Sequence, residues 1–509
     1  MIMKQTTLSQ SVIRAVAIIV GTIVLTLTAL SIMMGYDNKY ISKAALTQDN
    51  LVLIPEKGYC ALVDGWELYP DALLSPEDFS SETPACYNTW AGEYPNLSLF
   101  HADRNPYGTA TWRLRLQGNG TTTLYLQEPL CAARVFVNGV CLGGPGNVTS
   151  ENYAPLIRDT FFSFSLNGET ELIIQTANYS HYYGGIWYAP VIGDTDSVSH
   201  LIAGRMILYG LLFFSSLTLS LFCVVLWMRR KNTPDSITFY FGLLSLSFAL
   251  RIGYPFFRLA GLPFVRTLYA LEDLSALAGI FFSIQIIFLL FLPEGFRHLK
   301  KLCRLLSLGM CGFVVIVPVF LLPAIPSLVL WYGPLVSWYK LCMSGLGIGL
   351  TFYGCLTVLP HTKTALAALT ANGLFQLYGV LTIGCYEPFI GAYPEEYGTF
   401  CMVIAFAVLM VRRSLAIMEE NQKLNLHLQE EVQEKTVHLQ KLLSERGQLI
   451  AELGHDMKSP LTSLSNMAQI IRLNDLLLDE DTSKRMLHIE KQCDIPVSYT
   501  HLRAHETVL

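Results

Sequence analysis

A run of almost wholly apolar residues, AVAIIVGTIVLTLTALSIMM (15–34), lies close to the N-terminus. About 20 such residues are enough for a helix to cross the roughly 30 Å hydrocarbon core of a bilayer. Lys4 and Arg14 precede the run, and no small-x-small cleavage site follows it closely. We therefore interpret residues 1–35 as a retained membrane anchor with a cytoplasmic N-terminus, in preference to a cleaved signal peptide.

Further apolar segments follow after residue 200, with short connections between them. Their ranges are 203–227, 237–257, 270–292, 303–323, 328–355, 365–387 and 399–411. The chain is 52% hydrophobic and only 15% charged, which excludes an ordinary soluble enzyme of this length. Its net charge of −5 gives no basis for a nucleic-acid partner. We predict a bundle of seven spans over residues 200–413, in addition to the anchor.

Basic residues on alternate connections predict the orientation of these spans. They are Arg229, Arg230, Lys231, Arg297, Lys300, Lys301, Arg304, Lys363, Arg412 and Arg413. Because Lys and Arg favour the cytoplasmic side, residues 36–199 should lie outside and everything after 413 inside. Arg258 and Arg266 fall on the predicted outer side and are exceptions to this rule.

A few ionisable residues fall within or beside the predicted spans, where a charge facing lipid is costly. Arg251 should pair with Glu272 or Asp273 at the start of the next span, either as a switch or as a static pair. Lys340 lies in the middle of a span and is the stronger candidate for a functional role.

The exterior segment, residues 36–199, reads as an all-β domain. TATWRLRLQ (109–117), TTTLYLQE (121–128) and ELIIQT (171–176) have the composition of strands. Asn138 and Gly139 stand between two apolar runs, which predicts a tight hairpin. Short strands with frequent turns favour a β-sandwich.

Aromatic residues of this domain suit stacking on a ligand ring, although such residues more often fill a core. Trp66, Tyr183 and Trp187 are the candidates, and the YYGGIWY stretch (182–188) is the densest cluster. An oxidising exterior would permit disulfides among the domain's cysteines, with three alternative pairings of Cys60, Cys86, Cys131 and Cys141. The remaining cysteines lack metal-ligand spacing, so no metal site is expected.

Three stretches of this domain carry a family resemblance: 64–79, 135–155 and 178–193. They resemble the extracellular jelly-roll domain of bacterial seven-transmembrane receptors with diverse intracellular signalling modules. The following spans fit the same family, so the resemblance covers roughly residues 50–413. It implies an exterior domain that binds a carbohydrate or another small molecule, and a bundle that passes the signal inward.

After residue 413 the composition changes to a charged helical stretch. Apolar residues recur in steps of four and three, which supports a coiled coil over residues 414–444 and hence a homodimer. An amphipathic linker helix is the alternative.

The coiled coil leads into GHDMKSPL (454–461). A neutral imidazole can attack the γ-phosphorus of ATP when a neighbouring base holds the ring and takes its proton. His455 and Asp456 are suited to these two roles, and Pro460 would loosen the helix beside them. A lone His beside an acid is more often a solvated surface residue, so the surrounding sequence must decide.

The context ERGQLIAELGHDMKSPLTSLSNMAQIIRL (445–473) resembles the dimerisation and phosphoacceptor domain of sensor histidine kinases. The resemblance implies that His455 is the phosphoacceptor, Asp456 the assisting acid or base, and Pro460 the helix-bending position. Ser459 stands where threonine or asparagine is more common, which puts phosphatase activity in doubt. ATP, Mg²⁺ and a response regulator are the implied cofactors and partner. A second helix should begin near Asp481, giving a hairpin over residues 445–496.

The family pattern is not continued after Pro496, where an ATP-binding domain would be expected. Residues 497–509 read VSYTHLRAHETVL, which resembles a sequencing adaptor translated codon by codon from Val497 through Glu506. We interpret this tail as an artefact and the sequence as truncated.

Together these features predict a membrane sensor histidine kinase of the bacterial cytoplasmic membrane with both termini inside. It would have a jelly-roll sensor, an anchor plus seven spans, a coiled coil and a phosphoacceptor hairpin. A non-catalytic carbohydrate-binding receptor that signals through partner proteins is one alternative. A transporter using Lys340 and the buried acids is another.

Overall fold

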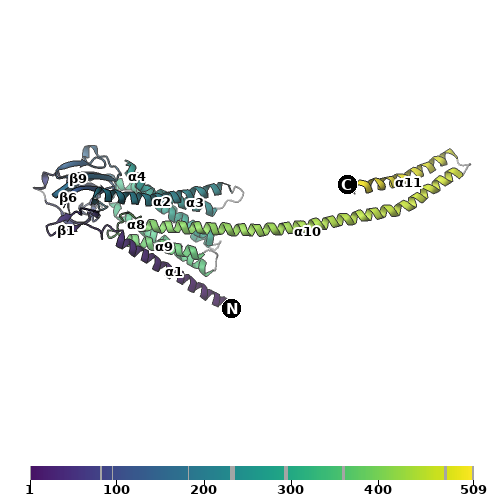
Figure 1. The fold of residues 1–509 in the computed structure, drawn as a ribbon, viewed down its shortest axis with the longest axis horizontal. Coiled ribbons are helices and arrows are strands. Elements are labelled where there is room, and N and C mark those ends of the chain that lie inside the picture. The colour runs from purple at the N-terminus through teal and green to yellow at the C-terminus, as the bar shows by residue number, and fades with distance from the viewer. Residues whose placement is uncertain are drawn as a thin grey trace. The chain divides into compact units, whose positions relative to one another are not determined.

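The computed structural model describes residues 2–80, 83–94, 96–181, 183–229, 236–291, 296–357, 362–474 and 479–506. The chain divides into two compact units, Met1–Val411 and Arg412–Leu509. The first unit contains the β-domain and the apolar helices (Figure 1). The second contains the charged helical segment.

Residues 45–193 form the predicted β-domain, a single connected sheet of ten strands. One path through it runs β1-β2-β6-β9-β7-β8. Two further strands, β4 and β10, also pair with β6, and they pair in turn with β5 and β3. All pairings are antiparallel except that of β2 with β6. The predicted jelly-roll arrangement of these strands stays a prediction. The strands are β1 (Ala45–Leu46), β2 (Leu51–Leu53), β3 (Tyr59–Ala61), β4 (Trp66–Pro70), β5 (Cys86–Thr89), β6 (Gly108–Leu126), β7 (Ala132–Val137), β8 (Val140–Gly143), β9 (Thr160–Asn178) and β10 (Val191–Gly193).

Strands β6 and β9 are each 19 residues long and pair along their whole length. The two strands predicted at 109–117 and 121–128 are therefore one strand, which corrects the sequence interpretation. The intervening Gly-Asn-Gly does not turn the chain back, because the ladder continues through it: Gly118 pairs with Gly168 and Gly120 pairs with Leu166. Gly120 and Gly168 adopt φ angles of +98° and +79°, which glycine tolerates within the paired strands. This long pair provides the frame to which the other strands attach.

The predicted hairpin at Asn138 and Gly139 is confirmed. Strands β7 and β8 pair on either side of these residues, whose φ angles are +46° and +82°. Two consecutive positive φ angles are what a type I′ turn requires, and Asn-Gly tolerates them best. The side chain of Asn138 also accepts a hydrogen bond from the amide of Glu171, which ties the turn to β9.

The core of the β-domain is built on large apolar side chains from β4 and β6. Trp66 and Trp112 are 0% and 2% exposed, and their rings meet edge-on with centroids 6.4 Å apart. The indole N–H of Trp66 donates to the carbonyl of Leu62 at 3.0 Å. Trp66 is therefore a core residue, and its candidacy as a ligand contact is wrong.

The helices of the first unit pack side by side in the order that their contacts define. α2 contacts α3, α3 contacts α5, α5 contacts α6 and α8, and α8 contacts α9, while α1 lies against α9 and α8. The α6 helix passes through a π-helical turn at Val317–Leu321, which contains Pro318, before the short α7 (Leu322–Ala324). The bounds are α1 (Ile2–Tyr36), α2 (Thr195–Arg229), α3 (Ser236–Ile252), α4 (Tyr254–Ala260), α5 (Val265–Phe291), α6 (Arg297–Ile316), α8 (Val329–Leu356), α9 (Thr362–Leu381) and α10 (Pro394–Asn474).

Among the described residues, seven helical stretches are long and apolar enough to cross a membrane. They correspond to seven of the eight predicted spans. The remaining one, α8, is helical over 28 residues but is not among the seven. Trp331, Tyr332, Tyr339 and Lys340 lower its mean hydropathy, which is consistent with a helix that carries polar side chains among apolar ones.

The helix α10 is 81 residues long and contains both the last apolar span and the segment around His455. Pro460 lies inside it, and the helix continues beyond that position to Asn474. A second helix, α11 (Glu480–Glu506), begins one residue before the predicted start. Both helices of the predicted hairpin are thus present, while the dimer that would pair two hairpins stays a prediction.

Replacing Trp66 by alanine should lower the free energy of unfolding by about 3–5 kcal/mol, because a buried aromatic leaves a large cavity. Tyr87 on β5 is 66% exposed and serves as the matched control. Tyr87→Ala should change stability by less than about 0.5 kcal/mol. Thermal unfolding of the full chain in detergent, followed by near-ultraviolet circular dichroism, measures both. Equal losses in the two variants would contradict the assignment of Trp66 to the core.

Candidate functional site

A group of buried charged residues joins the β-domain to the helices. We call it the boundary network. It draws on the end of α1, the loop after β6, the segment before β9, helices α2 and α4, and the loop between α9 and α10. Its members are Lys39, Gln127, Glu128, Asp159, Arg205, Arg258 and Glu387.

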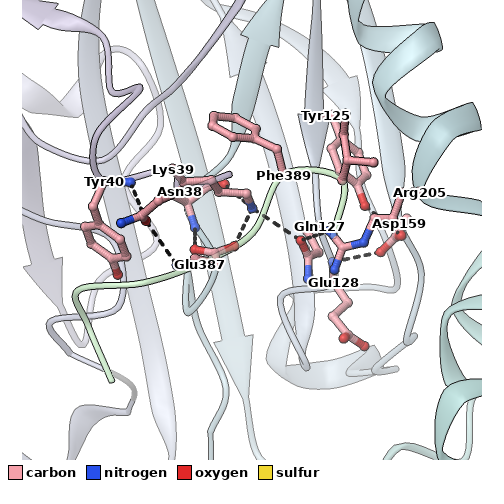
Figure 2. A network of polar contacts seen from close by, with 12 residues as sticks. Asn38, Lys39, Tyr40, Tyr125, Gln127, Glu128, Asp159, Arg205, Glu387 and Phe389 are labelled. Atoms are coloured by element: carbon pink, nitrogen blue, oxygen red, sulfur yellow. Dashed lines mark hydrogen bonds and ion pairs between the residues drawn. The ribbon is translucent and has the colours of Figure 1, made fainter. Parts of the chain in front are cut away.

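Lys39 is the centre of one half of the boundary network (Figure 2). Its ammonium forms an ion pair with Glu387 and donates to Gln127 Oε1 at 3.3 Å and to the carbonyl of Ala189 at 3.1 Å. Gln127 Oε1 also accepts from Arg205 of α2 at 3.2 Å. The other carboxylate oxygen of Glu387 accepts from the amide of Ala189 at 3.2 Å. One lysine thus connects the end of α1, the β-domain and the α9–α10 loop.

Arg258 of α4 is the centre of the other half. Its guanidinium lies 2.6 Å from Glu128 Oε1 and 3.7 Å from Asp159 Oδ1. The hydroxyl of Tyr254 donates to Glu128 Oε2 at 2.9 Å, and that of Tyr125 donates to Asp159 Oδ2 at 2.9 Å. These contacts join α4 to the loops at the end of β6 and the start of β9.

All six charged members of the network are at most 5% exposed. Three are cations, Lys39, Arg205 and Arg258, and three are carboxylates, Glu128, Asp159 and Glu387. Five of them form ion pairs, which makes their burial tolerable, whereas Arg205 donates to the neutral amide of Gln127. Burial lowers the pKa of Lys39 even though Glu387 opposes the shift, and burial raises the pKa of Glu128 even though Arg258 opposes it. In both groups burial outweighs the partner, so the pairing offsets only part of the desolvation cost.

The loop between α9 and α10 is held by the end of α1. The Asp37 carboxylate accepts hydrogen bonds from the amides of Phe389, Ile390 and Gly391 at 2.9, 3.1 and 2.7 Å. The Lys39 amide donates to the carbonyl of Glu387 at 2.8 Å. Since α10 begins three residues after Gly391, the start of that helix is fixed to α1 and the β-domain.

The first turn of α10 carries two acids that contact other helices. Glu396 accepts from the hydroxyl of Tyr209 on α2 at 2.9 Å. Glu395 forms an ion pair with Arg251 of α3. The predicted partner of Arg251 was Glu272 or Asp273, so the pairing differs from the prediction. Asp273 accepts instead from the hydroxyl of Tyr332 at 2.6 Å.

Two of the predicted residues line one cavity of about 260 Å³. Trp187 reaches it from the β-domain and Lys340 from α8. Tyr183 does not line it but stacks on Trp187, with ring centroids 5.5 Å apart. Tyr183 and Trp187 lie on the loop after β9, and this loop is anchored by Asn178, which donates to the carbonyl of His181 at 2.6 Å. Burial lowers the pKa of His181 to about 3, so this ring stays neutral at ordinary pH.

His455 lies in the second unit, and its side chain is 88% exposed. Nδ1 of its ring stands 3.6 Å from Asp456 Oδ1, close to hydrogen-bonding distance. Ser459 and Pro460 follow within the next turns of α10. An exposed imidazole beside a carboxylate is available to a partner that approaches from solvent.

Among the described residues, the cysteines and the possible metal ligands form no further site. Cys60, Cys86, Cys131 and Cys141 are all free thiols in the structure. Within the described ranges, no group of three or more His, Cys, Asp or Glu side chains is placed to hold a metal ion.

Sequence reasoning missed most of the boundary network. One signal was present, because Arg258 and Arg266 violate the expected charge distribution. The structure gives the reason: Arg258 is neutralised by Glu128 and Asp159, and Arg266 donates to the carbonyls of Tyr179 and Ser180. Charged residues that break the positive-inside pattern thus marked the contact surface with the β-domain.

Comparisons with known proteins identify no relative. No family model and no curated protein matches the chain. Among solved structures, a β-galacturonidase from Eisenbergiella tayi matches at 15% identity and a TM-score of 0.21, over 28% of this chain and 25% of that one. A β-glucuronidase from Bacteroides uniformis matches at 16% and 0.21, over 26% and 17%. A β-glucosidase from Kluyveromyces marxianus matches at 11% and 0.20, over 34% and 21%. The chain thus spans a quarter or less of the length of these enzymes, and such TM-scores identify neither its fold nor its activity.

Removing one partner of the Lys39–Glu387 pair should lower the stability of the fold far more than removing both partners. Lys39→Met leaves a buried carboxylate without its cation and should destabilise the chain by about 3–5 kcal/mol. Adding Glu387→Leu should restore most of that loss, because an apolar pair of similar volume avoids the desolvation cost.

The exposed pair of Lys43 and Asp64, whose side chains are 48% and 29% exposed, provides the control. Lys43→Met should cost less than about 1 kcal/mol. Denaturant unfolding of the full chain in mixed micelles measures all three variants. If the double variant is no more stable than Lys39→Met, the pair is not the stabilising unit described above.

Proposed function

We propose that this protein is a membrane sensor histidine kinase of a two-component signalling system. An exterior β-domain of jelly-roll type would sense a small molecule, the helical bundle would pass the signal through the bacterial cytoplasmic membrane, and His455 would accept a phosphoryl group. The structure describes a β-domain joined to helices that are long and apolar enough to span a membrane.

The main support for the proposal is that α10 is one continuous helix from Pro394 to Asn474. Its first turn, with Glu395 and Glu396, contacts α3 and α2 beside the boundary network, and the same helix contains His455. A ligand-dependent shift at the first turn would therefore act on the helix that bears the phosphoacceptor. Switches of this kind work through small displacements of helices between two packed arrangements.

His455 and Asp456 would share the chemistry. The Nδ1–H of the neutral ring would point at the Asp456 carboxylate, which a small side-chain rotation brings within hydrogen-bonding distance from the present 3.6 Å. The Nε2 lone pair is then free to attack the γ-phosphorus. A new N–P bond forms as the P–O bond to the leaving ADP breaks, and Asp456 takes the Nδ1 proton.

ATP would supply the phosphoryl group and Mg²⁺ would neutralise the charge of its phosphates. We assign no residue of the described ranges to hold them. The exposed His455 is accessible to a kinase domain that carries the nucleotide and afterwards to the receiver domain of a response regulator. The proposal includes a homodimer through the coiled coil of residues 414–444 and the hairpin of α10 and α11. With Ser459 in place of a water-orienting threonine or asparagine, we expect weak phosphatase activity.

The native gene product in inside-out membrane vesicles should become labelled by γ-³²P-ATP and Mg²⁺. The label should be labile to acid and stable to alkali, as a phosphoramidate is. His455→Gln should abolish it, and Asp456→Asn should slow it about 10²- to 10⁴-fold, the usual contribution of a general base.

His438 provides the matched control, since it is an exposed histidine of the same helix. His438→Gln should label like the wild type. Undiminished acid-labile labelling of His455→Gln would refute the phosphoacceptor assignment.

A further inference from the structure

The cavity of about 260 Å³ in the first unit has a lining that the proposed phosphotransfer does not use. The β-domain, the end of α1 and helices α5, α8 and α10 all contribute to it, together with the α9–α10 loop. Small-molecule sites in proteins usually measure about 300–1,000 Å³, so an occupant here would be small. Its aromatic walls are Tyr40, Trp187, Tyr188, Tyr269, Tyr386 and Tyr393.

Lys340 is the cation of this cavity that lacks a direct partner. Across the described part of the chain it makes no hydrogen bond and no ion pair. It interacts electrostatically with Glu395, but Glu395 is already paired with Arg251. Lys340 also lines a second, smaller cavity with these same two residues. One carboxylate therefore faces two cations.

The other acid of the lining is also occupied. Glu387 is paired with Lys39 and accepts from the amide of Ala189, so both of its oxygens are used. Arg251 also interacts electrostatically with three other acids, Glu272, Asp273 and Glu396, but none of these lines the cavity. Each of the two acids that line the cavity thus has its own paired cation, Lys39 for Glu387 and Arg251 for Glu395, and Lys340 is the lining cation that is not paired in this way among the described residues.

Two tyrosine hydroxyls are further unused donors of this cavity. The side-chain oxygens of Tyr386 and Tyr393 are buried and have no hydrogen-bond partner among the described residues. Both residues line the cavity, and Tyr386 is only 6% exposed. Buried hydroxyls are nearly always hydrogen-bonded, so two without a partner in one cavity call for an explanation. An occupant with acceptor oxygens would satisfy them and Lys340 together.

We infer that this cavity is a binding site for a small organic anion, a carboxylate attached to a ring. The carboxylate would accept hydrogen bonds from Lys340 and from the tyrosine hydroxyls, and the ring would lie against Trp187, which is backed by the stacked Tyr183. The site lies beside Glu395 in the first turn of α10 and Glu387 of the boundary network. The inference depends on the proposed function only for the consequence of binding, which would bias the start of α10.

The test is direct binding to the full chain in lipid nanodiscs by isothermal titration calorimetry. The probes are two ring carboxylates from different sources, indole-3-acetate and glucuronate, each with an uncharged counterpart, indole-3-acetamide and glucose. At least one carboxylate should bind with a Kd below about 1 mM and at least tenfold more tightly than its counterpart. Which one binds distinguishes an aromatic acid from a sugar acid.

Variants of the lining residues test whether the carboxylate binds in this cavity or elsewhere on the protein. Lys340→Met should abolish the advantage of the carboxylate, Lys340→Arg should keep most of it, and Trp187→Leu should weaken the carboxylate about tenfold. Lys363→Met, which removes an exposed cation of α9, should bind like the wild type. Thermal unfolding confirms that each variant is folded.

Absence of binding by both carboxylates, equal binding of the uncharged counterparts, or unchanged binding by Lys340→Met would overturn the inference. Because no step of the assay involves ATP, its outcome is independent of phosphorylation at His455. Loss of the proposed kinase function would leave the binding result standing, and the reverse also holds.

Discussion

The structure of the first unit depends on one constraint: six charged side chains are buried where the β-domain meets the helices. Lys39 and Glu387 illustrate it, because each would be strongly destabilising without the other. Their pairing requires the end of α1, the α9–α10 loop and the β-domain to be in place at once. Apolar contacts tolerate small displacements, whereas buried ion pairs require a defined geometry. The network therefore fixes one arrangement of the domain on the bundle.

This arrangement places the cavity directly beside the start of α10. The cavity and the boundary network share Glu387, and the cavity and the Arg251 pair share Glu395. A molecule in the cavity would thus alter the electrostatics of both pairs without needing a separate relay. Because Glu395 belongs to the helix that carries His455, the proposed path from ligand to phosphoacceptor consists of one cavity and one helix.

Local patterns in the sequence predicted the elements well where one physical signal dominated. The apolar runs gave the helices, the Asn138–Gly139 pair gave the β7–β8 turn, and Glu480 begins α11 near the predicted position. The prediction failed where local signals conflict with long-range pairing. Gly120 marks a break in strand propensity, yet pairing with β9 continues through it.

Partners of charged residues could not be predicted, because they depend on how distant segments pack. Arg251 was assigned to acids close in sequence, but the bundle brings Glu395 to it from 144 residues away. In the sequence, Trp66 and Trp187 are equally good candidates for stacking on a ligand. Only the packing shows that Trp66 fills the core and that Trp187 lines a cavity. The charge exceptions at Arg258 and Arg266 were the one sequence feature that pointed to the boundary network.

Hydrogen–deuterium exchange of the full chain in nanodiscs tests the role of the network most directly. We expect slow exchange for the amides of residues 389–391, which are bonded to Asp37, and for the amide of Lys39. In Lys39→Met, exchange of these segments should accelerate while that of the paired strands β6 and β9 stays unchanged. Rapid exchange of residues 389–391 in the wild type, or no change in the variant, would contradict the claim that this network holds the β-domain and the start of α10 together.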